Sequence, residues 1–501
     1  MLASALAFAL ISGCGDDDEP PSNNPSRGGS SGAPSADAGE GGTAGSGAGG
    51  LSPSAGGGAG GAGGAPAEVL GTCPDNQTGK DAALAPDGSS IAFVACGAGE
   101  PAVVVRSLTT GAVTQIGAAG PETTVEWLKD GETLIFGTEE ALFARRADAS
   151  TPSTQIGLEG AAVDEYRAFY ERVGMGNNQA FVPRLLVLES EFETRRLSVY
   201  KLDDGYAKPK LLLEDAELTG DLSYLSDSGR TLVSILGTGA AAKYSKIRTD
   251  GSIAPITLGF GPADFVLAPI GLGDTHDYAL EAGTDHLVRI QLETAMLTEL
   301  VPGGSGLLVG QGMTNVFDRE DAPGTKFVFY IQNGDITRRG REGKDEPIVL
   351  ADADAVAHTL SIDTNTLVYL SDKKLYSVPA LPEAGTESTL LVDEDNDETT
   401  LNLVFSPHNT FAYPFGSSLH RASLETLTAE RIDTDSAEFR ALTFDGLGEA
   451  LWFLDEGKLT RVPATTTEAV VVSEGVERFW AIPNSEDVLA EIAGEFKLIT
   501  P

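Results

Sequence analysis

Short polar turns and apolar strands alternate along the chain in a pattern that recurs about ten times between residues 67 and 501. The turn at residues 85–88 (Ala-Pro-Asp-Gly) leads into the apolar run 91–94, and the turn at 129–131 (Lys-Asp-Gly) leads into 134–136. A polar break and a second strand follow each apolar run. Because each unit is too small to bury its own apolar face, the units must stack on their neighbours.

Two kinds of strand are distinguishable in each unit. Residues 327–331 and 451–454 are continuously apolar, which predicts burial on both faces between stacked sheets. Residues 197–202, 374–378 and 458–462 alternate apolar and polar side chains, which predicts one packed face and one solvated face. Helix signals are nearly absent. Each unit is therefore interpreted as four antiparallel strands.

The spacing of the turns predicts the architecture, because 38 to 50 residues separate consecutive turns, as in four-stranded propeller blades. The turns lie near Asp87, Asp130, Asn178, Ser228, Asp274, Gly324, Thr364, His408, Leu447 and Ser485. We predict an all-β protein, a β-propeller of about 8–10 four-stranded antiparallel blades in a single ring. Two smaller rings in tandem, or an over-count of the weaker units, are the alternatives.

The last unit stops one strand short. It ends after residues 495–499, and residues 67–71, which precede the first unit, have the composition of a strand. We expect residues 67–71 to complete the last blade, since such an exchange closes a ring without an open strand edge.

The first unit also resembles a known repeat. Residues 85–93 (Ala-Pro-Asp-Gly-Ser-Ser-Ile-Ala-Phe) are similar to the Ser-Pro-Asp-Gly-x-x-Ile-Ala-Phe core of WD40-like repeats, which occur in the Tol–Pal periplasmic propeller and in prolyl-oligopeptidase propellers. Residues 406–409 and 129–131 are degraded copies. The resemblance implies the fold alone, because propellers of this kind serve as scaffolds, receptors and lids of enzymes. No hydrolase domain accompanies the repeats.

The first 66 residues are predicted to contain a targeting signal followed by a flexible linker. Residues 1–13 form an apolar run that is too short for a transmembrane helix and suits a secretory signal peptide. It ends in Ile-Ser-Gly-Cys, which resembles a bacterial lipobox and implies lipidation of Cys14; an ordinary signal peptide is the alternative. Asp16 is one place later than an inner-membrane retention signal, so the outer membrane of the cell envelope is favoured, on its periplasmic face or the cell surface.

Residues 14–66 are rich in Gly, Ala, Ser and Pro, with Leu51 as the only large aliphatic residue after Cys14. Such a segment cannot bury enough apolar surface to offset its backbone entropy, so we expect a disordered linker. As a flexible coil it would span ~40 Å and hold the propeller, residues 67–501, away from a membrane.

The formal charge of −40 argues against nucleic acid and against electrostatic docking on anionic lipid. The remaining two cysteines, Cys73 and Cys96, are predicted to form a disulfide, as a pair in an exported protein favours; two separate buried thiols are the alternative.

Candidate chemistry is sparse. The five histidines form no metal-binding spacing, and we expect structural roles for them and for the three tryptophans. Asp393, Asp395 and Asp397 alternate as carboxylates do in calcium loops, although Glu398 stands where an EF-hand needs Gly. Asp352 with Asp354, and Asp433 with Asp435, are smaller echoes. The interpretation is weak calcium binding on one rim or a solvated loop, with no other cofactor.

Two functions from different classes follow from these observations. A lipid-anchored propeller is predicted to act as a non-catalytic binding or scaffold module for a protein or glycan partner, as a monomer and without nucleic acid. The alternative is a propeller enzyme, a polysaccharide lyase or glycoside hydrolase, with carboxylates in the central funnel.

Overall fold

Strands make up nearly all the regular structure of the residues that the structure describes, as the repeated alternation predicts. The computed structural model describes residues 71–72, 81–96, 100–120, 122–128, 130–138, 141–157, 161–173, 180–191, 194–201, 209–215, 217–219, 222, 225–226, 229–267, 276–281, 284, 286–292, 294, 296–303, 327–340, 343–361, 365–381, 387–394, 401–415, 418–434 and 439–501. They belong to one compact unit, Val69–Pro501. Within them the only helical turn is the short 3₁₀ segment η2 (Gly239–Ala241).

The described residues form ten antiparallel sheets, each built from consecutive strands. Sheets 1 to 5 contain β1 (Gly71–Thr72), β2 (Ala82–Leu84), β3 (Ser90–Cys96), β4 (Ala102–Ser107) and β5 (Val113–Ala118); β6 (Thr124–Trp127), β7 (Thr133–Thr138), β8 (Ala141–Arg146) and β9 (Thr154–Ile156); β10 (Ala162–Val173), β11 (Ala180–Glu191), β12 (Thr194–Lys201) and β13 (Lys210–Asp215); β14 (Leu218–Thr219), β15 (Thr231–Leu236), β16 (Lys243–Arg248) and β17 (Ile256–Thr257); and β18 (Phe265–Leu267), β19 (His276–Glu281), β20 (Leu287–Gln291) and β21 (Met296–Val301).

Sheets 6 to 10 follow the same order. They contain β22 (Phe327–Gln332), β23 (Asp335–Gly340) and β24 (Ile348–Ala351); β25 (Ala355–Leu360), β26 (Thr366–Ser371), β27 (Lys374–Pro379) and β28 (Thr389–Val392); β29 (Val404–Phe405), β30 (Thr410–Phe415), β31 (Ser418–Ser423) and β32 (Thr428–Ile432); β33 (Arg440–Phe444), β34 (Leu451–Asp455), β35 (Lys458–Val462) and β36 (Val470–Glu474); and β37 (Val476–Ala481), β38 (Val488–Ile492) and β39 (Glu495–Ile499).

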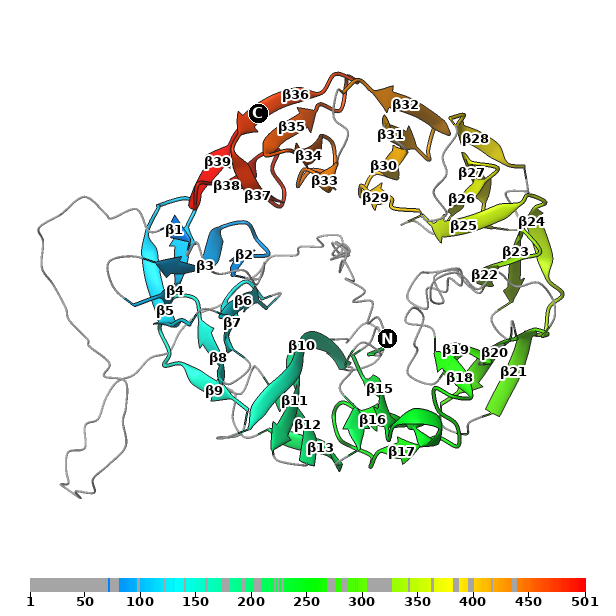
Figure 1. Cartoon of the computed structure of the whole chain (residues 1–501), viewed down its shortest axis with the longest axis horizontal. Helices are drawn as coiled ribbons and strands as arrows, with labels where there is room; N and C mark the ends of the chain where they lie inside the picture. Colours follow the sequence, from blue (N-terminus) through cyan, green and yellow to red (C-terminus); the bar gives the residue numbers. More distant parts are fainter. Residues whose placement is uncertain are drawn as a thin grey trace, which may run out of the picture. The chain divides into compact units, whose positions relative to one another are not determined.

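The ten sheets follow one another around a single ring, with the last sheet beside the first (Figure 1). Apolar clusters join neighbouring sheets, and one of them joins the two ends of the array by packing Leu489 and Phe496 against Phe93. The rings of Phe93 and Phe496 have centroids 4.8 Å apart. The described residues thus form a β-propeller of ten sheets, at the upper end of the predicted range, and the expectation of one ring is confirmed over two in tandem.

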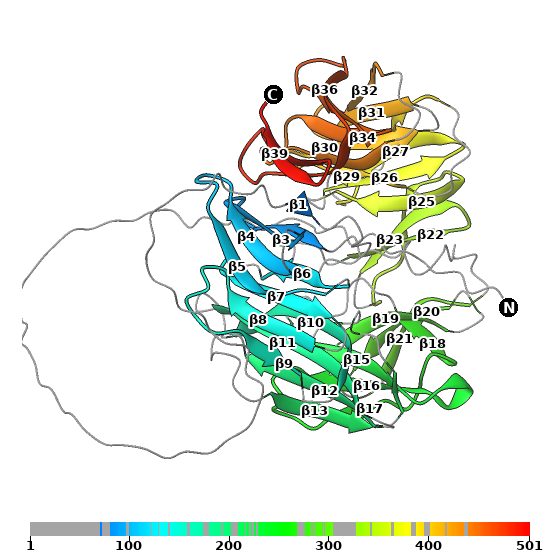
Figure 2. The same cartoon turned by 60° about the vertical axis from the view of Figure 1, so that its left-hand side comes forward.

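The described residues cover only the last residue of the expected strand exchange, which stays a prediction for residues 67–70. Of residues 67–71 only Gly71 is described, and β1 pairs antiparallel with β3 of the first sheet, through Gly71 with Cys96 and Thr72 with Ala95. β1 also lies close to β39 (Figures 1 and 2). In the described residues sheet 10 keeps three strands, and side chains rather than a shared strand join it to sheet 1.

The continuously apolar runs form β34, the second strand of sheet 9, and β22, the first described strand of sheet 6, and are buried on both faces, as predicted. On β34, Leu451, Trp452 and Phe453 are each 0% exposed, and on β22 Phe329 is 0% exposed. The alternating strands β27 and β35 lie one position further out. The core is therefore a series of apolar layers between neighbouring sheets.

The Asp-Gly turns have a physical reason in the structure. The Asp87 carboxylate accepts a hydrogen bond from the Ser89 amide (2.9 Å), and the Asp130 carboxylate accepts one from the Glu132 amide (2.9 Å). This Asx arrangement satisfies backbone donors that the tight turn leaves without a partner. Gly88 follows with a φ of +71°, and a Cβ at this position would lie 2.8 Å from the Ile482 side chain of sheet 10.

Gly88 and Gly111 offer a matched pair of substitutions. Gly111 has a φ of +70° and no atom within 4 Å of its added Cβ. Gly111→Ala is expected to cost about 1 kcal/mol for the left-handed conformation alone. Gly88→Ala is expected to cost about 2 kcal/mol, because contact with sheet 10 is added. Urea unfolding of both variants measures this, and equal losses would contradict the contact.

Half-buried arginines also join neighbouring sheets through backbone carbonyl oxygens. Arg145 on β8 donates to Ile116 of β5, and Arg339 on β23 donates to Leu300 of β21. Arg145 also donates to the Ala149 carbonyl, as Arg339 does to that of Gly343. The same device therefore connects sheet 1 to sheet 2 and sheet 5 to sheet 6.

Candidate functional site

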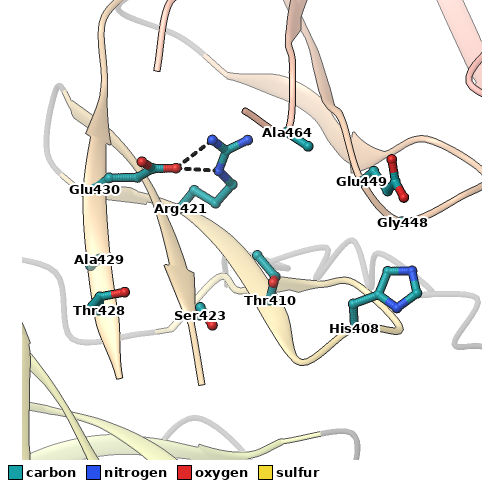
Figure 3. Close-up of a pocket in the computed structure, with 10 residues that line it drawn as sticks. All are labelled: His408, Thr410, Arg421, Ser423, Thr428, Ala429, Glu430, Gly448, Glu449 and Ala464. Atoms are coloured by element: carbon teal, nitrogen blue, oxygen red, sulfur yellow. Dashed lines mark hydrogen bonds and ion pairs between the residues drawn. The ribbon is translucent and has the colours of Figure 1, made fainter. Parts of the chain in front are cut away.

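A polar hollow of about 640 Å³ lies between sheets 8 and 9 (Figure 3). One wall comes from β30, β31 and β32 of sheet 8, and the other from loops of sheet 9. Its lining residues are His408, Thr410, Arg421, Ser423, Thr428, Ala429, Glu430, Gly448, Glu449 and Ala464. Three hydroxyl groups, two carboxylates, one imidazole and one guanidinium are thus brought together by two sheets.

Arg421 is held in place by protein groups on both walls. Its Nε donates to Glu430 Oε1 at 2.7 Å, Nη1 donates to the Pro463 carbonyl at 2.8 Å, and Nη2 donates to the Thr466 carbonyl at 2.8 Å. The Arg421 side chain is only 7% exposed, whereas that of Glu430 is 46% exposed. The guanidinium therefore fixes the geometry of the wall, and Glu430 is the partner that solvent reaches.

His408 connects the two walls at the turn end of the hollow. Its Nε2 lies 2.9 Å from the Leu447 carbonyl oxygen, so Nε2 carries the proton that is donated. The Ser406 hydroxyl donates to the Gly448 carbonyl at 2.5 Å. The predicted structural role of His408 agrees with this contact, because its donor is directed to the backbone of sheet 9.

The lining favours a ligand that is rich in hydrogen-bonding groups and neutral or cationic. The hydroxyls of Thr410, Ser423 and Thr428 donate or accept hydrogen bonds, and Glu430 and Glu449 bring negative charge from opposite walls (Figure 3). The one guanidinium in the lining is already paired with a carboxylate. An anionic ligand therefore meets an unfavourable field in this hollow.

The calcium candidates are only partly described. Asp393 forms an ion pair with Lys374 at 2.5 Å, while Asp395 and Asp397 lie outside the described residues. In the part of the chain that the structure describes, no group of three or more His, Cys, Asp or Glu side chains is arranged to hold a metal ion. The calcium loop stays a prediction.

Asp352 and Asp354, one of the two shorter carboxylate pairs, form a cluster with Asp335. Burial raises the pKa of Asp335, and the nearby carboxylates of Asp352 and Asp354 raise it further. At the second echo, Asp433 accepts a hydrogen bond from the Thr467 hydroxyl at 3.2 Å, and Asp435 lies outside the described residues. The two echoes therefore have different surroundings.

The described residues include only one of the three cysteines on which predictions were made. Cys96 at the end of β3 is disulfide-bonded, but Cys73 and Cys14 lie outside the described residues. β1 directly precedes Cys73 and pairs with the end of β3 at Cys96, which is consistent with the predicted bridge. The pairing of Cys73 with Cys96 and the lipidation of Cys14 stay predictions. No helix within the described ranges is long and apolar enough to span a membrane.

Two histidines and two tryptophans belong to the core. His358 on β25 is 3% exposed and His420 on β31 is 4% exposed, while Trp127 and Trp452 are 8% and 0% exposed. Trp480 is half-buried against the cluster that joins sheets 10 and 1. Burial lowers the pKa of His358 to about 3 and also lowers that of His420.

The buried His358 predicts loss of stability in acid. Its pKa falls from 6.5 to about 3 on folding, so the unfolded chain binds the proton more strongly. The neutral form stabilises the fold above pH 6.5, and that contribution is lost as the pH falls towards 3. Between pH 7.5 and pH 4.5 the free energy of unfolding is expected to fall less in His358→Leu than in the parent protein. The difference between the two falls is on the order of 2 kcal/mol.

Urea unfolding at the two pH values measures this difference. The carboxylates titrate in both proteins, so the comparison isolates the imidazole. An equal pH dependence in the two proteins would show that His358 is not the responsible group.

The linear sequence did not point to Arg421 or Glu430. Arginine recurs on the strand that follows the apolar strand in several sheets, as Arg145 on β8, Arg339 on β23 and Arg461 on β35, and this recurrence was the available signal. It is weak, because the acceptors of Arg421 include two backbone carbonyls that are present in any sequence.

Several solved structures are similar to this chain. The tricorn protease is 11% identical over a match that covers 78% of this chain and 43% of that one, with a TM-score of 0.33. The WD40 domain of SCAP from fission yeast is 10% identical, with 86% and 95% covered and a TM-score of 0.34. A catalytically inactive virginiamycin B lyase from Staphylococcus aureus is 13% identical, with 67% and 100% covered and a TM-score of 0.31.

The chain spans less than half the length of the tricorn protease. No protein-family model matches the chain, and no curated protein matches it. The likeness to the solved structures brings no family, activity or partner to this chain.

Proposed function

We propose that this propeller is a non-catalytic binding module that takes a protein or glycan partner at the hollow between sheets 8 and 9. The observation that supports this is the state of the charged groups there. Arg421 is engaged by Glu430 and two carbonyls, and His408 donates to the backbone of sheet 9. The lining is thus a preorganised hydrogen-bonding surface in which Arg421 and His408 are already engaged by protein groups.

A variant that fills the hollow tests the proposal. Thr428 is an exposed residue of the lining, so Thr428→Trp should fold normally and block access. Thr109→Trp, at an exposed turn of sheet 1, makes the same change elsewhere. Oligosaccharides and envelope-protein peptides that bind the parent protein should bind Thr428→Trp at least about tenfold more weakly and Thr109→Trp normally. Equal binding to all three proteins would exclude the hollow.

The enzyme alternative is favoured by one observation, which is that Glu430 and Glu449 line the same hollow from opposite walls (Figure 3). Paired carboxylates are the machinery of glycoside hydrolysis. A panel of polysaccharides incubated with the parent protein and with Glu449→Gln separates the two functions. Turnover that Glu449→Gln abolishes would replace the binding module by an enzyme.

We also propose that the chain is a lipoprotein of the bacterial cell envelope, attached through Cys14, with the outer membrane favoured. The lipobox-like sequence and the Gly-rich segment that follows it support this proposal. Labelled palmitate should enter the parent protein and not Cys14→Ser, and Cys14→Ser should leave the membrane fraction. Identical location and labelling of the two proteins would contradict the anchor.

A further inference from the structure

The last sheet has no described strand on the outer side of its third strand, β39. In the eight sheets with four or more described strands, the strand at the third position, such as β31 or β35, pairs on its outer side with a further strand, such as β32 or β36. In sheet 6, which also has three described strands, β23 follows the apolar strand β22 and pairs on its other side with β24. β39 holds the equivalent position in sheet 10, pairing inward with β38. Among the described residues no strand pairs with its outer side.

Side-chain exposure agrees with this open position. Thr460 and His420, the third residues of β35 and β31, are 3% and 4% exposed under their fourth strands. Lys497 is the third residue of β39, and its side chain is 50% exposed. Leu498 beside it is 51% exposed. The outer side of β39 therefore has the exposure of an edge, at a position that the other sheets cover.

The hairpin geometry shows which backbone groups face the open side. A two-residue turn joins β38 to β39. Ala493 has a φ of 51° and Gly494 a φ of 75°, as in a type I′ hairpin. In such a hairpin the residues that flank the turn, Ile492 and Glu495, form a hydrogen-bonded pair, and hydrogen-bonded pairs then alternate along the strand. Lys497 therefore bonds to β38, while the N–H and C=O groups of Phe496 and Leu498 point outward.

We propose that the outer edge of β39 accepts an extended strand from a partner protein, and that this strand alternates aliphatic and basic side chains. Strand addition to a sheet edge takes its affinity from main-chain hydrogen bonds and its specificity from alternate side chains. The aliphatic residues would cover Leu498. This surface is separate from the hollow between sheets 8 and 9.

The negative charge of the region around β39 favours a basic partner strand. Between residues 440 and 501 the chain has eleven acidic and five basic side chains, and its formal charge is −40 overall. A basic strand is therefore attracted to this region, and the attraction weakens as salt screens it. A second copy of the chain carries the same charge, so edge-to-edge pairing of two copies is opposed by repulsion.

Two substitutions at one residue separate the main-chain contribution from the side-chain contribution. Leu498→Pro removes an outward N–H and leaves the hydrogen bonds of Lys497 to β38 in place. Leu498→Ala keeps the N–H and removes only part of the side chain. The probe is a fluorescent peptide of about eight residues with alternating Lys and Val, added to the full-length protein and followed by anisotropy.

Leu498→Pro is expected to bind this peptide at least about tenfold more weakly than the parent protein, and Leu498→Ala within about threefold of it. A peptide of the same length with alternating Glu and Val should not bind. Equal affinity of the parent protein and Leu498→Pro, or equal binding of the basic and acidic peptides, would overturn the proposal. Concentration-dependent dimers that Leu498→Pro abolishes would assign the edge to a second copy instead.

Hydrogen exchange of the parent protein keeps the proposal testable even where Leu498→Pro does not fold. The basic peptide is expected to slow amide exchange in the segment 495–499 by about tenfold. Exchange that the peptide leaves unchanged would overturn the proposal. Exchange without peptide that is already as slow as in β35 would do so too, because the edge would then be covered by this chain itself. Thr428→Trp should bind the basic peptide normally, so a failure at the hollow and a failure at β39 are distinguishable.

Discussion

Arg478→Ala is expected to lower the free energy of unfolding by about 3–5 kcal/mol, because it leaves two buried carboxylates without their cation. Arg478 Nη1 and Nη2 donate to Asp81 Oδ1 at 2.7 Å and Oδ2 at 3.2 Å, and Nε donates to Glu491 at 2.7 Å. Asp81 and Glu491 are 3% and 1% exposed. Burial alone would lower the pKa of Arg478, but the hydrogen bonds to the two carboxylates raise it.

This contact joins the two ends of the ring, since Arg478 and Asp81 are separated by 397 residues in the sequence. Urea unfolding followed by fluorescence measures the loss. Arg146→Ala is the matched control, because its ion pair with Glu132 is exposed, at 43% and 61%, and such pairs contribute under about 1 kcal/mol. Similar losses in Arg478→Ala and Arg146→Ala would show that the closure does not depend on the buried pair.

Phe453→Ala is expected to destabilise the ring by about 3–5 kcal/mol, through lost apolar burial and the cavity that remains. Phe453 is 0% exposed at the centre of β34 and packs with Leu419, Phe444 and Leu451 between sheets 8 and 9. Its ring also meets that of Phe439 edge to face, with centroids 5.4 Å apart.

Val471→Ala is the control for this substitution, because Val471 lies on β36 of the same sheet and is 49% exposed. It should change the free energy of unfolding by less than about 0.5 kcal/mol. A loss in Phe453→Ala as small as that in Val471→Ala would mean that the layer between sheets 8 and 9 is not cooperative with the rest of the ring.

Much of the blade architecture was predictable from local pattern. The Asp-Gly turn at Asp87 and the apolar run of β34 are local features, because a turn needs its own carboxylate and a strand buried on two faces needs only apolar residues. Gly71 was expected in the last sheet, whereas it pairs with β3 of the first sheet. The short sequence of this strand fits either end of the ring, and only the pairing with Cys96 distinguishes them.

The candidate site was much less predictable. Its lining comes from segments of two sheets, and Arg421 is held by carbonyl oxygens of Pro463 and Thr466, which lie 42 and 45 residues away. Backbone carbonyls have no sequence signature. The carboxylate run at Asp393 was conspicuous in the sequence, yet in the structure that residue pairs with Lys374.

The amino-acid sequence determined the repeating unit, its four-strand design and the acidic character of the chain, because turn chemistry, strand burial and net charge are properties of neighbouring residues. The tertiary structure decided the number of sheets in one ring, the closure through Arg478 and Asp81, the hollow beside Arg421 and the edge position of β39 among the described strands. These features depend on which distant segments meet when the last sheet returns to the first, and that outcome is set by the packing of the whole ring.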